Sequence, residues 1–300
     1  HGRLIRGVRN GPSPDWMQKR LKAIGINPKN LAVDVTNYIS FDRARPMHVY
    51  DAAKLTGGIV ARLGRADEQL AALDGKTYAN LVDMCVIADD RGPVGLGGVM
   101  GGEATGCTAE TADIFLEAAW FDPARTARTA RATGILSDAR FRYERGVDPR
   151  SQAEAIEWAT RLILEHGGGE ASEVRVAGAD PALPPPVTFR LRDMARLTGV
   201  AMDAARMADI LSKLGFSHAP AGDGVWRVQP PSFRPDIDGS ADIVEELIRI
   251  EGFDALPSAA LPTLERAGSR VVVTPLQQRV RIARRVMAAR GFLETVTWSF

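Results

Sequence analysis

The chain has 300 residues, of which 45% are hydrophobic and 25% charged, and its formal net charge is +1. At roughly 100–200 residues per domain this length predicts two domains and part of a third, and the average composition excludes disordered, collagen-like and coiled-coil proteins. No stretch approaches the roughly 18 apolar residues of a membrane span, and two cysteines cannot form a disulfide framework, so we expect a cytoplasmic protein with reduced thiols.

The first half of the chain is expected to mix helices and strands. Helices are predicted where apolar or basic residues recur every three or four positions, at 13–24, 125–131 and 151–166. Runs rich in β-branched or aromatic residues and bounded by Gly, Asp or Asn predict strands at 31–39, 59–63, 84–88 and 113–121.

A proline-rich segment at 178–187 predicts a linker, because three consecutive prolines favour an extended, semi-rigid spacer. A small unit is expected to follow, with strands at 187–191 and 225–229 and helices at 191–198, 203–214 and 239–251. A second break is expected at 257–262, followed by an Arg-rich helix at 275–291 and a strand. Residues 270–290 hold six Arg and no acid, which suits either RNA or an acidic partner surface.

Glu117 is the first candidate functional residue. It lies in the predicted strand 113–121, whose two faces are both apolar, and a carboxylate buried there costs several kcal/mol unless it has a partner. One interpretation is a structural acid that pairs with an arginine of the 125–145 segment. The other is an acid placed to bind a ligand.

His48 and a glycine-rich segment are the next candidates. His48 could act as an acid, a base or an orienting group near neutral pH, or it could be a turn histidine that caps local backbone. Residues 95–103 hold five glycines but lack the Gly-Lys-Ser/Thr of a P-loop, which argues against a Walker nucleotide site. This segment is either a tight hairpin or a place where backbone approaches a ligand closely.

An acidic cluster is the last candidate, and its members are Asp236, Asp242, Glu245 and Glu246. Helical spacing puts the last three on one face, where like charges repel by about 0.2–0.5 kcal/mol per pair. Oxygen ligands in this number suit Mg²⁺ or Ca²⁺. The alternative is a solvated acidic helix face. If these carboxylates only repel one another, replacing Glu245 and Glu246 by Gln is expected to stabilise the chain slightly.

Five motifs together resemble a known family, the β subunits of bacterial phenylalanyl-tRNA synthetase. The motifs are Val33-Asp-Val-Thr-Asn-Tyr38, Pro46-Met-His48, Gly97-Gly-Val-Met-Gly-Gly-Glu103, Phe115-Leu-Glu-Ala-Ala-Trp-Phe121 and Ser137-Asp-Ala-Arg-Phe-Arg-Tyr-Glu-Arg-Gly-Val-Asp-Pro149. One departure is Asn27, at a position where relatives often carry Arg.

The resemblance implies a multi-domain α+β fold. A mixed-sheet B3/B4 editing module is expected at 1–178, a small winged-helix-like B5 domain at 187–257, and the start of a class II catalytic-like domain at 262–300. It also implies an α2β2 tetramer that joins phenylalanine to tRNA(Phe) with ATP and Mg²⁺, the synthetic site lying in the α subunit.

The same resemblance implies that this part of the chain hydrolyses tyrosine mistakenly attached to tRNA(Phe). The implied catalytic residues are His48 and Glu117, the substrate-binding residues are Gly101, Ser137 and Ala139, and the magnesium-linked residues are Asp236, Asp242, Glu245 and Glu246. No Ser-His-Asp or Cys-His pattern is visible, so attack by a positioned water is expected. The alternative function is a non-catalytic RNA-binding or structural module, although helices 191–198 and 203–214 hold few residues that read bases.

Overall fold

A computed structural model describes residues 1–259 and 273–298. The chain divides into two compact units, His1–Leu256 and Pro257–Phe300. The domain boundary predicted at 178–187 lies inside the first of these units. This boundary therefore stays a prediction. The break predicted at 257–262 lies partly outside the described residues.

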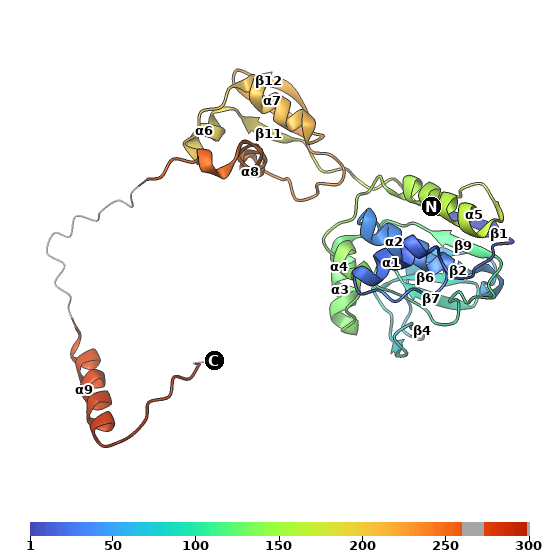
Figure 1. Cartoon of the computed structure of the whole chain (residues 1–300), viewed down its shortest axis with the longest axis horizontal. Coiled ribbons are helices and arrows are strands. Elements are labelled where there is room, and N and C mark those ends of the chain that lie inside the picture. The colour runs from blue at the N-terminus through green and yellow to red at the C-terminus, as the bar shows by residue number, and fades with distance from the viewer. Residues whose placement is uncertain (260–272, 299–300) are drawn as a thin grey trace. The chain divides into compact units, whose positions relative to one another are not determined.

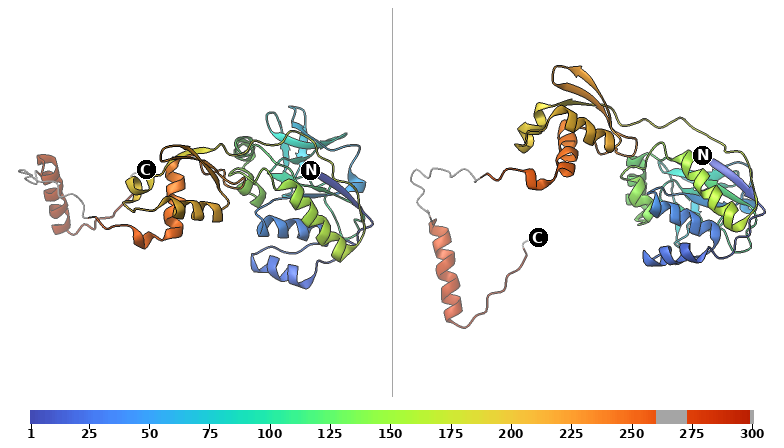
Figure 2. Two further views of the ribbon diagram at one scale, coloured as in Figure 1. Left: turned by 90° about the horizontal axis from the view of Figure 1, so that it is seen from above. Right: turned by 45° about the horizontal axis from the view of Figure 1, so that its top comes forward.

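The first sheet has the strand order β10-β1-β9-β2, and all its pairings are antiparallel. Its strands are β1 (Gly2–Arg6), β2 (His48–Asp51), β9 (Ile114–Glu117) and β10 (Glu170–Ala171). One face carries apolar side chains such as Ile5 and Leu116, which form one buried cluster with three helices. These are α1 (Asp15–Ala23), α2 (Leu31–Asp42) and α5 (Gln152–Gly167), which Figures 1 and 2 show beside one another.

The opposite face of this sheet packs on a second antiparallel sheet, of order β3-β6-β7-β8. Its strands are β3 (Val60–Leu63), β6 (Cys85–Asp89), β7 (Gly92–Leu96) and β8 (Met100–Gly101). Between the sheets lies a cluster that includes Tyr50 and Phe115 from the first and Ile87 and Val94 from the second. The remaining elements of this region are η1 (Ala52–Lys54), the hairpin β4 (Gln69–Ala71) and β5 (Thr77–Ala79), and the helices α3 (Pro123–Thr133) and α4 (Asp138–Tyr143).

The strand predicted at 31–39 is wrong, because this segment is helix α2. The Asn30 side chain caps the helix by accepting a hydrogen bond from the Val33 N–H at 3.1 Å. Leu31, Val35 and Ile39 recur every four residues and are buried on one helical face. A run this apolar satisfies the pattern of a buried strand as well as that of a buried helix, so composition alone favoured the wrong element.

Residues 187–256 form a three-stranded antiparallel sheet of order β11-β13-β12, packed on helices around their own buried cluster. The elements are β11 (Val187–Arg190), α6 (Arg192–Thr198), α7 (Ala204–Lys213), β12 (Ser217–Gly222), β13 (Val225–Gln229), α8 (Ser240–Glu251) and η2 (Phe253–Ala255). All but β12 and the short η2 were predicted. β12 is an edge strand that contains Pro220 and Gly222, the residues that argue against a strand in a sequence pattern.

The predicted α+β class is confirmed by this arrangement of antiparallel sheets and helices. In the second unit, α9 (Pro275–Ala289) confirms the predicted Arg-rich helix, and Thr274 caps it. The strand expected after it is not formed in the described part, up to residue 298. Across the described segments, no helix is long and apolar enough to span a bilayer.

Candidate functional site

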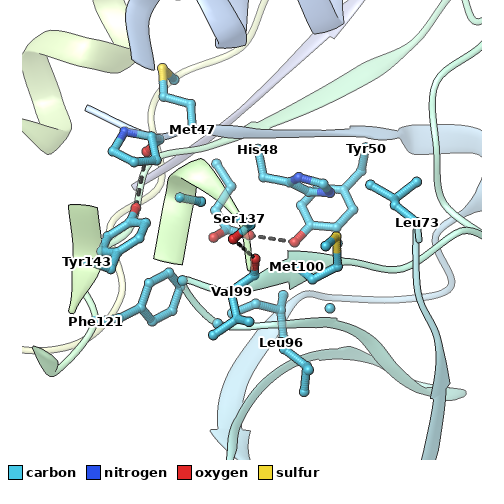
Figure 3. A pocket seen from close by; sticks show the side chains of 18 of the residues that line it. Met47, His48, Tyr50, Leu73, Leu96, Val99, Met100, Phe121, Ser137 and Tyr143 are labelled. Carbon is cyan, nitrogen blue, oxygen red and sulfur yellow. Dashed lines mark hydrogen bonds between the residues drawn. The ribbon is translucent and has the colours of Figure 1, made fainter. Parts of the chain in front are cut away.

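A cavity of about 270 Å³ opens between the two sheets of residues 1–178 (Figure 3). Its volume is near the lower end of the roughly 300–1,000 Å³ typical of small-molecule sites. Five residues singled out in the sequence all line it: His48, Gly101, Glu117, Ser137 and Ala139. Strands β2 and β9, the β7–β8 hairpin and helix α4 therefore bring together residues that lie up to 91 positions apart, from 48 to 139.

Glu117 projects into this cavity beside His48. The two residues are directly opposed in the antiparallel pairing of β9 with β2, so their side chains share one face of the sheet. Tyr50, two residues further along β2, lies on the same face, and Figure 3 shows its ring beside that of His48. The Tyr50 hydroxyl donates to Oε2 of Glu117 at 2.6 Å.

The expected pairing of Glu117 with an arginine of the 125–145 segment is therefore wrong. Its hydrogen-bond partner is Tyr50, and the guanidinium that acts on it belongs to Arg45. Arg45 is fully buried and donates to the Ala119 carbonyl at 2.6 Å. Neither partner was predicted, although the strand period of two would have placed Tyr50 on the His48 face once β2 was recognised as a strand.

Burial dominates the electrostatics of the site. It raises the pKa of Glu117, and the hydrogen bond from Tyr50 and the charge of Arg45 act in the opposite direction. It lowers the pKa of His48 to about 4, so this imidazole is neutral at neutral pH. His48 is the first residue of β2, and the interpretation as a turn histidine is wrong. As a neutral ring, His48 can orient a water or a substrate but does not supply a positive charge.

The glycine-rich segment is a hairpin, as one interpretation predicted, and a close approach of its backbone to a ligand stays a prediction. Residues 92–101 form the hairpin β7–β8, in which Gly95 pairs with Gly101. The same hairpin lines the cavity, and a Cβ atom added at Gly101 would lie 2.3 Å from Cε1 of His48. Glycine is therefore required at position 101 because the His48 ring occupies the space of a side chain.

Ser137 and Ala139 lie at the start of α4, on the wall formed by that helix. The Ser137 hydroxyl donates to the Val99 carbonyl at 2.6 Å and accepts from the Arg140 N–H at 3.1 Å. The first bond ties α4 to the hairpin, and the second caps the helix. With these two partners, the hydroxyl serves to shape the wall, and the small side chain of Ala139 leaves the cavity open beside it.

The acidic cluster takes a different form from the one expected. Arg234 forms ion pairs with Asp236 at 2.7 Å and with Glu246 at 3.0 Å. Arg249 also pairs with Glu246, whose exposed fraction is only 5%. The hydrogen bond from Arg234 is the largest cause that lowers the pKa of Glu246, which keeps this carboxyl ionised. The interpretation as a solvated face is therefore wrong for Glu246.

The other two acids of the cluster take no part in these ion pairs. Asp242 accepts hydrogen bonds from the N–H groups of Asp238 at 3.0 Å and Gly239 at 2.8 Å at the start of α8, and Glu245 is exposed. Within residues 1–259 and 273–298, no group of three or more His, Cys, Asp or Glu could hold a metal ion. Because guanidinium groups already neutralise Asp236 and Glu246, this arrangement does not fit the expected magnesium ligand set.

Two family models match the chain. A model described as B3/4 domain matches residues 1–168, and one described as tRNA synthetase B5 domain matches residues 187–253. The chain is similar to proteins named phenylalanine–tRNA ligase beta subunit from Paramagnetospirillum magneticum (51% identity, 100% of this chain and 37% of the relative) and Mesorhizobium japonicum (48%, 99% and 37%). A third, from Rhodospirillum rubrum, is 51% identical over 100% of this chain and 37% of its own length.

A solved N-terminal fragment of the phenylalanyl-tRNA synthetase β-subunit from Pyrococcus horikoshii also matches. The match covers 82% of this chain and 69% of the fragment, with 17% identity and a TM-score of 0.39. The chain spans about 37% of the length of the curated relatives named above.

Proposed function

Because the chain belongs to the family of phenylalanine–tRNA ligase β subunits, we propose that its cavity hydrolyses the ester of tyrosine mistakenly attached to tRNA(Phe). The observation that carries this proposal is the half-buried carboxylate of Glu117, which already accepts a hydrogen bond from a phenol, that of Tyr50. In the described part of the chain, no residue donates a hydrogen bond to its second oxygen, Oε1. The phenol of a bound tyrosine is the group that fits this acceptor.

The chemistry of discrimination supports the same substrate. Phenylalanine and tyrosine differ by one hydroxyl, and an apolar pocket cannot strongly reject an added hydroxyl. A site that requires the hydroxyl can discriminate by about 10⁴-fold, because its polar groups are otherwise left unpaired. A hydrogen bond to a charged group contributes about 1.5–3 kcal/mol. Glu117 supplies such a group, and the small side chain of Ala139 leaves room for the ring.

The reaction requires a water to attack the carbonyl carbon of the ester while the bond to the ribose oxygen breaks. Tyrosine and the free hydroxyl of the tRNA are the products. Glu117 would hold the phenol, and neutral His48, at the cavity wall, would orient the attacking water through a ring nitrogen. The hydroxyl of Ser137 keeps its hydrogen bond to the Val99 carbonyl and has a structural role in the cavity wall.

The surface beside the cavity suits the tRNA that would carry the ester. Residues 123–145 hold six Arg and two acids. Leu136 and Phe141 are 84% and 55% exposed, and they line a hollow that shares Ser137 with the cavity. Unpaired bases stack on aromatic rings and guanidinium planes, and Arg145 lies 3.7 Å over the Phe141 ring. We expect the 3′ end of the tRNA to bind here.

The experiment is a time course of deacylation of tyrosyl-tRNA(Phe) by the protein. Glu117→Ala should abolish the preference for the tyrosyl ester while the protein stays folded, and Glu154→Ala, on the exposed face of α5, is the control. If Glu117→Ala cleared tyrosyl-tRNA at the parent rate, the assigned cavity would be wrong. If the parent bound tRNA without hydrolysing it, the alternative of a non-catalytic RNA-binding module would hold.

The remaining expectations concern the whole protein. Assembly with an α subunit as α2β2, ATP- and Mg²⁺-dependent attachment of phenylalanine by that partner, and a cytoplasmic location all stay predictions. No step of the proposed hydrolysis depends on them.

A further inference from the structure

We propose that Tyr50 is the positioning residue that determines specificity in this cavity: its hydroxyl holds Oε2 of Glu117 and so presents Oε1 to the phenol of the substrate. This inference rests on the proposed preference for tyrosine. It goes beyond the residues singled out in the sequence, where Tyr50 had no role.

The fold leaves the Tyr50 ring little freedom. Only 1% of the residue is exposed. Its ring contacts that of His48 edge-on, with centroids 4.4 Å apart, and lies 6.3 Å from that of Phe115 on β9. Because rings pack on it from its own strand and from the neighbouring strand, the hydroxyl stays directed at Glu117. The 2.6 Å bond is therefore a fixed feature of the site.

A carboxylate that is held by one oxygen has a defined orientation. Ionised Glu117 has two acceptor oxygens and could rotate about its terminal bond, so an unheld carboxylate would present either oxygen at variable angles. With Oε2 bound to Tyr50, Oε1 is left at one position relative to the cavity wall. A substrate phenol that donates to Oε1 then completes a carboxylate held between two phenols. Phenylalanine leaves Oε1 without a donor.

The charge of Glu117 depends on the same contact. Several titratable or charged groups face it: Tyr50 and His48 on β2, Arg45 ahead of β2, Cys85 on β6, Tyr143 on α4 and the amino group of His1. Burial raises the pKa of Glu117, and the bond from Tyr50 is the largest cause that lowers it. Burial also raises the pKa of Tyr50 well above its usual value, so this hydroxyl stays protonated and remains a donor.

The test variant is Tyr50→Phe, which removes one oxygen and keeps the ring. The matched control is Tyr78→Phe, because Tyr78 donates to a carboxylate oxygen of Asp74 at 2.7 Å and lies outside the cavity. Both variants lose a bond from a phenol to a carboxylate, and only the first loses it at Glu117. The kcat/KM values for tyrosyl-tRNA(Phe) and phenylalanyl-tRNA(Phe) are measured from acid to neutral pH, with the melting temperature as a check of folding.

Tyr50→Phe should lower the tyrosyl-to-phenylalanyl ratio by about tenfold, the equivalent of losing one charge-assisted hydrogen bond. Because the pKa of Glu117 rises without that bond, the acidic limb of tyrosyl-ester hydrolysis should move to higher pH. Tyr78→Phe should change neither quantity. If Tyr50 had a purely structural role, Tyr50→Phe would lower the melting temperature and the rates on both esters together. The tyrosyl-to-phenylalanyl ratio and the acidic limb of the pH profile would then stay unchanged, and that result would overturn the inference.

Calorimetric binding of free L-tyrosine and L-phenylalanine separates this inference from the proposed hydrolysis. If the parent protein prefers tyrosine but hydrolyses neither ester, hydrolysis is refuted, and loss of that preference in Tyr50→Phe still supports the inference. If the parent prefers tyrosine and Tyr50→Phe keeps the full preference, the inference is refuted and the proposed hydrolysis is untouched. If the parent shows no preference for tyrosine, both are refuted.

Discussion

Gly101→Ala should disable the cavity by steric means, without adding or removing any charge. The added Cβ would lie 2.3 Å from Cε1 and 2.8 Å from Nε2 of His48, and 3.2 Å from Cδ1 of Leu73. Real Cβ atoms do not approach other heavy atoms within 3.0 Å, so the imidazole or the hairpin must move. His48 is held edge-on against Tyr50, and its displacement therefore disturbs the residue that holds Glu117.

The cost follows from overpacking. Inserting a methyl group into a closely packed site costs about 1–3 kcal/mol, and a loss of that size in positioning lowers kcat/KM by about 5- to 150-fold. The assay is hydrolysis of tyrosyl-tRNA(Phe), followed together with urea unfolding. Gly95→Ala is the matched control: Gly95 is the strand partner of Gly101 and lines the same cavity, but its added Cβ would meet nothing closer than 3.5 Å.

Gly101→Ala should therefore lose activity and Gly95→Ala should lose far less. Parent-level activity in both variants would show that the His48 ring does not need its present place, and the steric argument would fail. Equal loss in both would indicate that the hairpin backbone, rather than the contact with His48, is sensitive to substitution.

Three further results are expected. Ala139→Trp should fill the cavity of about 270 Å³ and abolish tyrosyl-tRNA hydrolysis. In the proposed α2β2 assembly, synthesis should continue and tyrosyl-tRNA should accumulate; loss of both activities would mean that Ala139 supports the core. Glu246→Gln should lower the free energy of unfolding by about 1–3 kcal/mol in urea, because it leaves Arg234 and Arg249 without a charged partner; a more stable variant would restore the repulsion argument. The free energy of unfolding should fall by up to about 3 kcal/mol as pH drops from 6.5 to about 4, because in this pH interval His48 is protonated in the unfolded chain but not in the folded one. His48→Asn should flatten this dependence on pH.

The sequence predicted the longer helices and several strands, but it missed most of the short strands of residues 1–178, among them β1 and β2. Glu117 sits in a short apolar run, and the run is a strand. Helix α2 was missed because Leu31, Val35 and Ile39 lie in a run that is apolar enough for either element. What decides for the helix is the Asn30 cap and the packing of α2 against α5, and the second of these is a tertiary contact.

The partners of the charged residues were harder to predict. The Tyr50–Glu117 bond joins residues 67 positions apart, and it exists only because β2 pairs with β9 in one register. Arg234 reaches Glu246 from a loop before α8, which converts an expected repulsion into a pair of attractions. Sequence spacing within one helix describes neighbours along that helix, and it says nothing about a side chain that arrives from another segment.

The most direct test of the account is the ratio of kcat/KM for tyrosyl-tRNA(Phe) to that for phenylalanyl-tRNA(Phe), measured on the parent protein and on Glu117→Gln. The substituted amide keeps the shape of Glu117 but loses the charged acceptor. The parent should hydrolyse the tyrosyl ester much faster than the phenylalanyl ester, and Glu117→Gln should bring the two rates close together. Equal rates in the parent, or a ratio that survives the substitution, would contradict the assignment of Glu117 as the residue that recognises the hydroxyl.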